Sequence, residues 1–259
     1  MNEFAVKDTM LGAIIYVAIG LYFVATVAYL WRFRKLGELL FAAGFVVAAG
    51  AWTLRWTEVG YPPMQNLFEV FLTLGAAVYP ISLFCRRFLS QPLPAADSLI
   101  AAIVLFPAGF VFNANPQMLP PALQSWLFAP HVAAYMLSYV ILFMAAAQAV
   151  AQLAMGDERY ELGTYRIVRF GFPLLTLGLL LGSVWGKIAW GDYWNWDPKE
   201  LWSLASWLVF VAYLHFRYVT RTRLGRANSI WVILGCLAII MTLLWVNISH
   251  LFVGKHSYA

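Results

Sequence analysis

Residues 185–207 hold an unusual concentration of tryptophan, six of the twelve in the chain. They are Trp185, Trp190, Trp194, Trp196, Trp202 and Trp207. An aromatic belt at a membrane surface is the simpler explanation, because the indole ring is apolar while its N–H needs a polar partner. A belt has no need of the glycines in this stretch, Gly186 and Gly191. Flat rings with glycines between them favour a surface that holds a large, planar, apolar ligand.

The chain's four histidines are candidate metal ligands, and they are His131, His215, His250 and His256. His131 lies at the start of an expected helix, where the helix dipole disfavours the imidazolium and favours the neutral ring that a metal requires. His131 and His256 are expected on the same side of the membrane. They could therefore bind one iron axially, with one imidazole on each face. The alternative for His131 is an interfacial histidine bonded to a loop carbonyl.

His215 is expected at a different depth. It lies about 15 residues into an expected helix, which at 1.5 Å per residue is about 22 Å from the outer surface. It cannot share an iron with His131, so it predicts a second site, deeper in the membrane. The other ligand would have to come from another chain, because no other histidine is expected at that depth. The alternative is a histidine bonded to a neighbouring helix. We expect His250 to be interfacial.

The composition is typical of an integral membrane protein. Of the 259 residues, 63% are hydrophobic and only 11% are charged, and a soluble domain of this composition would expose large apolar patches. The net charge is +5, but no basic face combines with a soluble domain, so we expect no nucleic-acid binding. Cys85 and Cys236 are far apart and form no CxxC motif, so we expect neither a disulfide nor a dithiol redox centre.

Eight apolar runs approach the length of about 20 residues that a transmembrane helix needs. They are 11–31, 39–57, 66–84, 97–112, 130–153, 170–187, 200–219 and 229–250. The sequence therefore predicts an all-α, polytopic membrane protein with eight transmembrane helices, forming one domain over residues 1–259. Residues 156–165, which are polar and carry charges of both signs, are expected to connect two of these helices.

The distribution of Lys and Arg predicts the orientation, because cytoplasmic loops carry an excess of these residues. Alternate loops place twelve of the 17 basic residues on one side and five on the other. The first side is therefore assigned to the cytoplasm, and both termini are expected to be extracytoplasmic. The tryptophan segment then lies on the extracytoplasmic face, together with the loops 58–65 and 113–129.

Two helix starts carry the signature of a capping box. Asn66 and Glu69 have the required spacing at the third helix. Asp197 and Glu200 have it at the seventh, where Pro198 would occupy the first helical position. These signatures need no catalytic role for the acidic residues.

Three basic residues on the outer face, Arg55, Lys187 and Lys199, have two explanations. Each could be an interfacial side chain whose charged end reaches water. Alternatively, each could form a salt bridge with a carboxylate of a bound ligand. The residues alone do not decide between these explanations.

The tryptophan segment resembles the WWD signature of haem-handling proteins. Its continuation, Asp-Pro-Lys-Glu at 197–200, is typical of the CcsA/ResC branch, the System II cytochrome c synthase component, whereas the CcmC and CcmF branches of System I continue differently. Further matches are Pro63-x-x-Asn66-Leu67-x-Glu69, Pro130-His131, Leu137-Ser138-Tyr139, Tyr213-Leu214-His215 and Gly254-x-His256-Ser257-Tyr258. The resemblance covers the chain from about residue 58 to its end.

The resemblance implies a role for each matching position. His131 and His256 match the two external histidines that coordinate the iron of haem b (iron protoporphyrin IX), which is the substrate. His215 matches the histidine of an inner haem site within the membrane. The tryptophan segment matches the surface that holds the porphyrin, through Trp185, Trp190, Trp194, Trp196 and Asp197. Lys255, before the terminal histidine, stands where family members often have an apolar residue.

The resemblance also implies the function, which is cytochrome c biogenesis at the bacterial cytoplasmic (inner) membrane. The chain would transport haem and present it at the periplasmic face, where the CxxCH thiols of apocytochrome c form thioethers with it. It would be a holocytochrome c synthase of the lyase type, acting with a CcsB/ResB-type membrane protein. A thioredoxin-like protein would supply reducing thiols, and membrane lipid would surround the helices.

Two other functions are compatible with the same residues. The first is a haem exporter or chaperone that hands haem to another carrier and carries out no ligation. The second is the membrane subunit of a quinone-linked electron-transfer complex. Such subunits usually place pairs of ligands across helices within the bilayer, whereas this chain offers only His215 at depth, so the second function ranks low.

Overall fold

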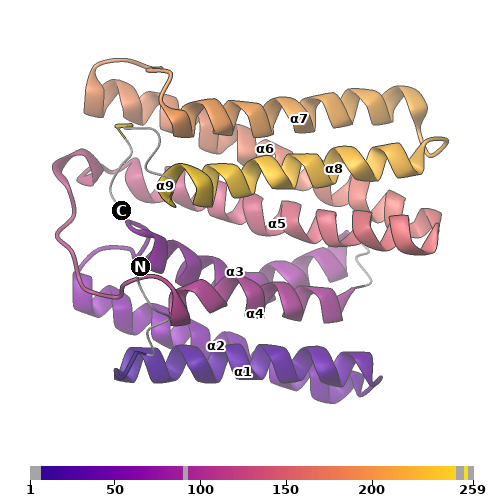
Figure 1. Ribbon diagram of the computed structural model, residues 1–259, viewed down its shortest axis with the longest axis horizontal. Coiled ribbons are helices and arrows are strands. Elements are labelled where there is room, and N and C mark those ends of the chain that lie inside the picture. The colour runs from indigo at the N-terminus through magenta and orange to yellow at the C-terminus, as the bar shows by residue number, and fades with distance from the viewer. Residues whose placement is uncertain (1–6, 90–92, 249–253, 256–259) are drawn as a thin grey trace. The chain divides into compact units, whose positions relative to one another are not determined.

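The computed structural model describes residues 7–89, 93–248 and 254–255, and these residues form helices and loops without a β-strand (Figure 1). The long helices are α1 (Met10–Leu30), α2 (Arg34–Val59), α3 (Leu67–Phe88), α4 (Pro94–Phe110), α5 (Phe128–Met155), α6 (Glu158–Trp190), α7 (Pro198–Thr220) and α8 (Gly225–Ile240). Three short elements complete the set: η1 (Pro121–Leu123), the π-helical turn η2 (Met241–Trp245) and α9 (Val246–Ile248). The all-α prediction is confirmed for the described residues.

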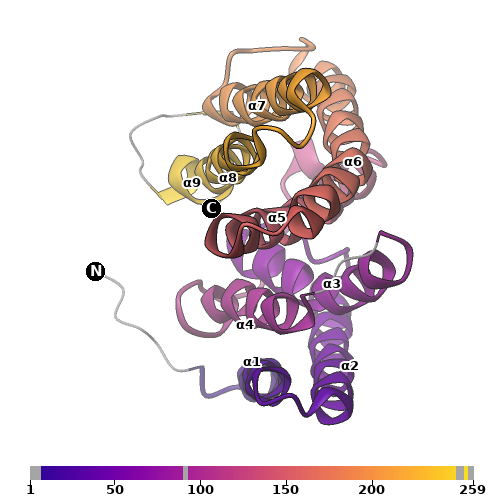
Figure 2. The same cartoon turned by 90° about the vertical axis from the view of Figure 1, so that its right-hand side faces the viewer.

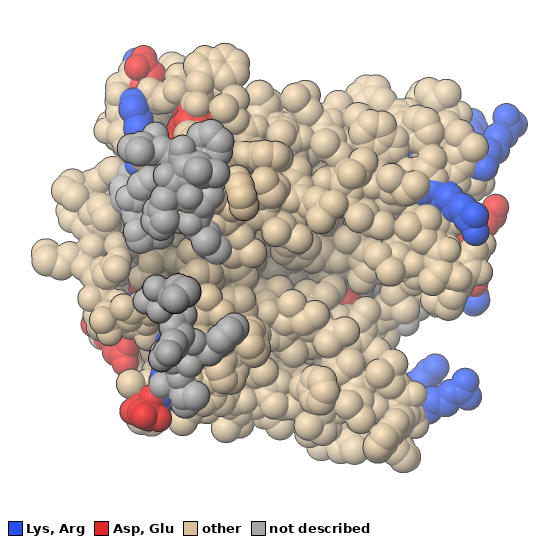
Figure 3. All heavy atoms as spheres, in the orientation of Figure 1, with Lys and Arg blue, Asp and Glu red and all other residues tan. Residues whose placement is uncertain are grey.

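Six of these helices are long and apolar enough to cross a membrane, rather than the predicted eight. They are α1, α2, α3, α5, α6 and the continuous stretch Gly225–Trp245. Helix α4 is apolar but has only 17 residues, and α7 has the length without the apolar content. The space-filling view agrees with a membrane location, because charged side chains gather near helix ends and the flanks are almost free of them (Figure 3).

Contacts group the chain into two units. The first covers residues 1–86 and 92–121, and in it α1 packs against α2 and α4. The second covers residues 87–91 and 122–259, and in it α5 packs against α6 and α8 while α7 packs against α8 (Figure 2). The candidate residues His131, His215 and 185–197 belong to the second unit, whereas Arg55 belongs to the first. The single-domain assignment stays a prediction.

Helix α6 begins earlier than the apolar pattern indicates. It starts at Glu158 rather than near residue 170, so most of the expected connector 156–165 is helical. Asp157 caps it, with its carboxylate accepting a hydrogen bond from the Arg159 N–H at 2.9 Å. Hydrogen bonds from the Arg159 guanidinium, and then this backbone bond, hold the pKa of Asp157 below its usual range. Glu161, one turn later, is buried in an ion pair with Arg217 of α7. An apolar pattern cannot detect a helical turn whose buried residue is charged.

The structure agrees with the expectation of no disulfide, and the absence of a dithiol redox centre stays a prediction. Cys85 and Cys236 are both free and buried. The Cys236 thiol lies 3.2 Å from the Leu142 carbonyl oxygen. Neither thiol is available for exchange with a substrate.

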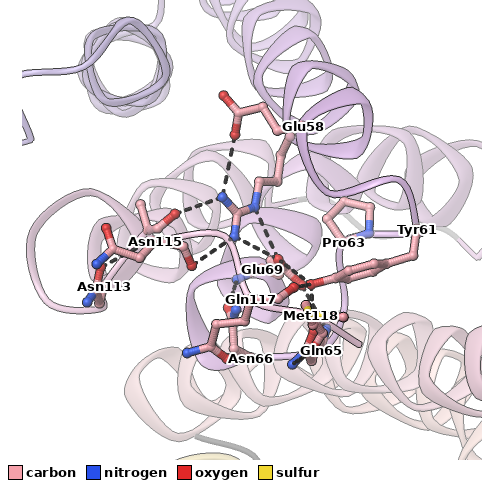
Figure 4. Close-up of polar contacts among 12 residues, drawn as sticks. Glu58, Tyr61, Pro63, Gln65, Asn66, Glu69, Asn113, Asn115, Gln117 and Met118 are labelled. Carbon is pink, nitrogen blue, oxygen red and sulfur yellow. Dashed lines mark hydrogen bonds and ion pairs between the residues drawn. The ribbon is translucent and has the colours of Figure 1, made fainter. Parts of the chain in front are cut away.

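A buried ion pair joins α2 to α3 at one end of the first unit (Figure 4). Arg55 of α2 and Glu69 of α3 are fully buried, and two guanidinium nitrogens lie 2.9 and 3.1 Å from Glu69 Oε1. The same guanidinium donates to the carbonyl oxygens of Ala114 and Asn115, at 2.7 and 3.4 Å. Arg55 therefore binds protein groups, which removes it from the candidates for a ligand carboxylate.

The loop between α2 and α3 is fixed by the same carboxylate. Glu69 Oε2 accepts a hydrogen bond from the Gln65 N–H at 2.9 Å, and the Asn66 side chain caps α3 by accepting from the Glu69 N–H at 3.0 Å. Only half of the predicted capping box forms, because the Glu69 carboxylate bonds Gln65 and Arg55 instead of the Asn66 N–H. Burial and the Glu69 charge raise the pKa of Tyr61 to about 12, so its hydroxyl donates to the Gln117 carbonyl oxygen at 3.0 Å at neutral pH.

Replacing Arg55 by methionine should lower the free energy of unfolding by about 3–5 kcal/mol, because the Glu69 charge is left buried without its partner. Unfolding in detergent micelles measures the change. The matched control is Arg159→Met, which breaks an ion pair whose arginine is 85% exposed and should have no measurable effect. Equal stability of the two variants would show that the buried pair is not needed.

Candidate functional site

The site is built around the imidazole of His131, in the first turn of α5. The ring is half-buried, and its Nδ1 lies 2.9 Å from the Gly178 carbonyl oxygen of α6. A carbonyl oxygen only accepts hydrogen bonds, so Nδ1 carries the proton in this contact. The lone pair then resides on Nε2, which is the arrangement found in histidines that ligate metals.

Glycines on α6 make room for this ring. A Cβ atom added at Gly182 would lie 2.5 Å from Cε1 and 3.0 Å from Nδ1 of His131. One turn away, a Cβ at Gly178 would lie 2.9 Å from the ring of Tyr135. The imidazole and the phenol ring, four residues apart on α5, therefore pack on two glycines that are four residues apart on α6. This glycine seat lets the two helix backbones approach closely.

Trp185 forms a wall beside the imidazole. It is only 2% exposed, and its ring lies nearly parallel to that of His131, with centroids 5.9 Å apart and 15° between the planes. Its indole N–H donates to the Ala122 carbonyl oxygen at 3.0 Å. Trp190 packs edge-on against it, with ring centroids 4.7 Å apart. Trp185 thus restricts the imidazole on the face where the two rings stack.

The other tryptophans of the segment differ in exposure. Trp190 and Trp194 are half-buried, whereas Trp196 is 66% exposed and adopts a positive φ of 56°. The Trp194 and Trp196 rings meet edge to face, with centroids 6.0 Å apart. Trp207 lies within α7, where its N–H donates to the Thr176 hydroxyl at 3.0 Å. The six indoles do not form one continuous wall.

Two glycines of the segment have local roles in the turn. Gly191 ends α6 with a φ of +90°, a conformation that residues with a side chain rarely adopt. A Cβ at Gly186 would approach the Asp192 carbonyl oxygen at 3.3 Å, so the loop returns close to the helix there. The Lys187 ammonium also donates to the Gly191 carbonyl oxygen, which assigns this lysine to the helix end. These glycines are explained by the backbone path alone, without a ligand.

The predicted capping box at α7 is confirmed. One oxygen of Asp197 accepts from the Lys199 N–H at 2.9 Å, and the Glu200 carboxylate accepts from the Asp197 N–H at 3.1 Å. The same Glu200 oxygen accepts from the Asn195 N–H at 2.7 Å. The end of the tryptophan segment is thereby tied to the first turn of α7.

His256 and His250 lie outside the described residues, but Gly254 and Lys255 are described. The Lys255 N–H donates to Asp197 Oδ2 at 2.6 Å, and its ammonium lies 5.8 Å from the centroid of the Trp190 ring. Trp190 is the ring that packs on Trp185. The residue that precedes His256 is therefore held beside the same group of indoles that supports His131.

His215 lies on the exposed face of α7. Its Nδ1 is 2.9 Å from the Val211 carbonyl oxygen, four residues earlier in the helix, which leaves Nε2 with the lone pair. Tyr213 and Arg217 point into the protein core instead. Among the described residues, no group of three or more His, Cys, Asp or Glu could hold a metal ion.

Sequence reasoning missed the residues that position His131. Tyr135, Gly178 and Gly182 shape the seat, yet none of them carries a reactive group. A signal was present, because glycines spaced by four residues in an apolar helix predict close contact with another helix. The sequence could not reveal which histidine would occupy that contact.

The described helices define a multi-spanning helical membrane protein, with a half-buried imidazole at the start of α5. Residues 64–253 match the model of the family described as Cytochrome C assembly protein. The chain belongs to this cytochrome c assembly family.

Curated relatives are named cytochrome c biogenesis protein CcsA. The protein from Guillardia theta is 33% identical, with 79% of each chain covered. The protein from Prochlorococcus marinus (strain MIT 9313) is 31% identical over 85% of this chain and 83% of the relative. The protein from Gloeothece citriformis (strain PCC 7424) is 31% identical over 87% and 88%.

A solved structure named cytochrome c heme lyase CcmF has a similar fold. The TM-score is 0.70 at 22% sequence identity, and the match covers 94% of this chain. This chain spans about half of the length of CcmF, since 48% of that protein is covered. The likeness concerns the fold alone.

The glycine seat predicts a coupling between Gly182 and His131. Gly182→Ala should destabilise the chain by about 1–3 kcal/mol, because the added methyl group overlaps the imidazole. In a His131→Ala background the same change should cost less, with a coupling of about 1 kcal/mol or more. Unfolding titrations in detergent of the single and double variants measure this coupling.

The control is Gly20→Ala in α1, where a Cβ would meet no atom within 4 Å. It should show no coupling to His131→Ala. Equal costs of Gly182→Ala in the two backgrounds would contradict the seat.

Proposed function

We propose that this chain is the haem-handling component of a System II cytochrome c synthase in the bacterial cytoplasmic membrane. Haem b is its substrate. The observation that carries the proposal is the His131 imidazole, whose Nδ1 donates to the Gly178 carbonyl oxygen, so that the lone pair lies on Nε2, the nitrogen that would ligate iron. Membership of the cytochrome c assembly family and the relatives named CcsA support the same function.

In the outer site, His131 provides one axial ligand to the haem iron and His256 provides the other. Trp185 holds the imidazole in place from behind, as its burial and its near-parallel contact with the ring indicate. The less buried indoles of Trp190, Trp194 and Trp196 are then available to pack on the macrocycle. Asp197 belongs to this site through the contacts that it makes with α7 and Lys255.

The chemistry of this site is mainly positioning. Two neutral imidazoles favour low-spin, six-coordinate iron and close both axial positions to oxygen, which protects the ferrous state. Each thiol of an apocytochrome c CxxCH motif adds across a vinyl group, so a sulfur–carbon bond forms and the thiol hydrogen goes to the neighbouring carbon. Holding the two reactants in register replaces a dedicated acid or base. The histidine of the motif then displaces one axial ligand, which releases the product.

Other proteins complete this activity. A thioredoxin-like protein reduces the substrate cysteines, because Cys85 and Cys236 are buried and cannot do so. A CcsB/ResB-type partner supplies the second ligand of an inner site, where His215 exposes its imidazole. Helix α7 has no stretch apolar enough to place it among the six candidate spans, which fits a helix covered by a partner protein rather than by lipid.

The proposed topology has eight transmembrane helices, with both termini and the tryptophan segment outside. Helices α4 and α7 cross the membrane together with the six candidate spans. The excess of Lys and Arg in one set of loops supports this orientation. The outer haem site then opens to the periplasm, where apocytochrome c is found.

His131→Ala and His256→Ala should each lower the haem that copurifies with the chain and its partner by about tenfold, because each removes an axial ligand. Imidazole added during purification should restore both the haem content and the low-spin absorption spectrum. Trp31→Ala, which removes an indole that is exposed near the end of α1, is the control and should leave both unchanged. Unaltered haem spectra in both histidine variants would refute the outer site.

The alternative is a haem exporter or chaperone without ligation activity. Reconstitution with haem, a thiol reductant and a CxxCH peptide separates the two functions. A thioether product, detected by mass spectrometry, supports the synthase. Haem transfer without a covalent product would assign the chain to the chaperone class.

His215→Ala should lower the amount of haem at the outer site without changing its spectrum, because the ligands of the outer iron remain. The haem content per protein and the absorption bands, measured on the complex with the partner, test the two parts separately. A normal haem load would remove His215 from the transport route. A changed spectrum would place this histidine at the outer iron.

A further inference from the structure

The Asp197 carboxylate serves two segments of the chain that are far apart in sequence. Oδ1 accepts the Lys199 N–H at 2.9 Å and so caps α7, while Oδ2 accepts the Lys255 N–H at 2.6 Å. Asp197 is 5% exposed, so both bonds are shielded from water. A helix cap requires only one side-chain oxygen, which serine, threonine or asparagine would also provide. The second oxygen is used by the C-terminal segment.

Gly254 provides the space for this contact. A Cβ added there would overlap Asp197 Oδ2 and lie 3.2 Å from Pro198 Cδ. Gly254 does not have the positive φ that would require glycine, so the need for glycine at this position is steric. Any side chain would push the segment away from the carboxylate.

Lys255 adds a second attachment through its side chain. Its ammonium donates to Asn195 Oδ1 at 2.5 Å and lies over the ring of Trp190. Asn195 is itself tied to Glu200 through its N–H, at 2.7 Å. The main chain and the side chain of Lys255 are therefore both bonded to the end of the tryptophan segment.

We propose that Asp197 is a positioning residue for the outer haem site, acting as a latch that holds Gly254 and Lys255 against the tryptophan segment. The latch fixes the chain at Lys255, the residue immediately before His256, beside the Trp190 ring. This inference rests on the proposed function, because it gives Asp197 its role through the His256 ligand. The charged acceptor suits the task, since a hydrogen bond to a carboxylate is about twice as strong as a neutral one.

Two variants open the latch in different ways. Asp197→Asn keeps one carbonyl oxygen for the cap of α7, but the amide cannot accept the Lys199 and Lys255 N–H groups on separate oxygens. Gly254→Ala leaves the cap untouched and displaces the C-terminal segment by steric overlap. Gly50→Ala in α2, where a Cβ would meet no atom within 4 Å, is the control.

The first measurement is the rate of trypsin cleavage after Lys255 in the full chain in detergent, followed by intact mass. Cleavage of a transiently opened segment follows the population of the open form. Loss of a hydrogen bond to a charged group should raise that population, and with it the rate, by about tenfold or more in both variants. The control should match the unaltered chain.

The second measurement is the absorption spectrum of the copurified haem. In Asp197→Asn and Gly254→Ala we expect part of the haem to change from the low-spin to the high-spin form. Added imidazole should restore the low-spin bands, which a misfolded site would not allow. The control should keep the spectrum of the unaltered chain.

The results separate the latch from the haem site. If His256→Ala changes the spectrum while the two latch variants alter neither spectrum nor cleavage, the latch is wrong and the outer site stands. If the histidine variants leave the haem unchanged, the proposed function fails. In that case faster cleavage still supports Asp197 as the anchor of the C-terminal segment, and unchanged cleavage overturns it.

Discussion

The hydrogen bond between His131 Nδ1 and the Gly178 carbonyl oxygen is the contact on which the site depends. It joins α5 to α6 and fixes both the tautomer and the direction of the imidazole. It can form only because Gly182 leaves space for the ring. A larger residue there would separate the helices, and Trp185 would lose its contact with the imidazole. The position of the His131 imidazole thus depends on the lack of a side chain at Gly182.

Buried charges fix the ends of the helices in both units. In the first unit, Arg55 and Glu69 join α2, α3 and the backbone of two loops. In the second, Glu161 pairs with Arg217 and also accepts a hydrogen bond from Asn228 at 2.9 Å, which joins α6, α7 and α8. Such pairs hold only while every member is present, because each carboxylate would otherwise be buried alone. These pairs fix the register between neighbouring helices, which contacts between apolar side chains alone do not determine.

Much of the fold could be predicted from the sequence, because length and apolar content identify helices directly. All eight expected ranges contain a helix, and the Asp197–Glu200 cap forms as its spacing predicts. Six of the eight expected spans have the length and apolar content that a membrane crossing needs, since α4 has only 17 residues and α7 combines helical length with polar residues. The first turns of α6 were missed because Glu161 and its neighbours are polar, although they are helical. The pairing of Glu161 with Arg217, which a single sequence does not show, explains why these polar turns belong to the helix.

The residue types of the candidate site could be read from the sequence, but their geometry could not. His131 was proposed as a ligand mainly from the family resemblance, together with its place at a helix start, whereas its support by Tyr135, Gly178 and Trp185 depends on how α5 meets α6. The tryptophans looked equivalent in sequence, yet Trp185 is buried while Trp196 is exposed. Equal residue types in one segment therefore have different tasks, which follow from the turn at Gly191.

Helix α6 has 33 residues, which corresponds to about 50 Å along its axis. The hydrocarbon layer of a bilayer is only about 30 Å thick. The helix therefore extends beyond the lipid. The glycine seat of His131 lies in the half of α6 that is farther from Glu158. One continuous helix thus connects an exposed end at Glu158 with the glycines on which the imidazole packs.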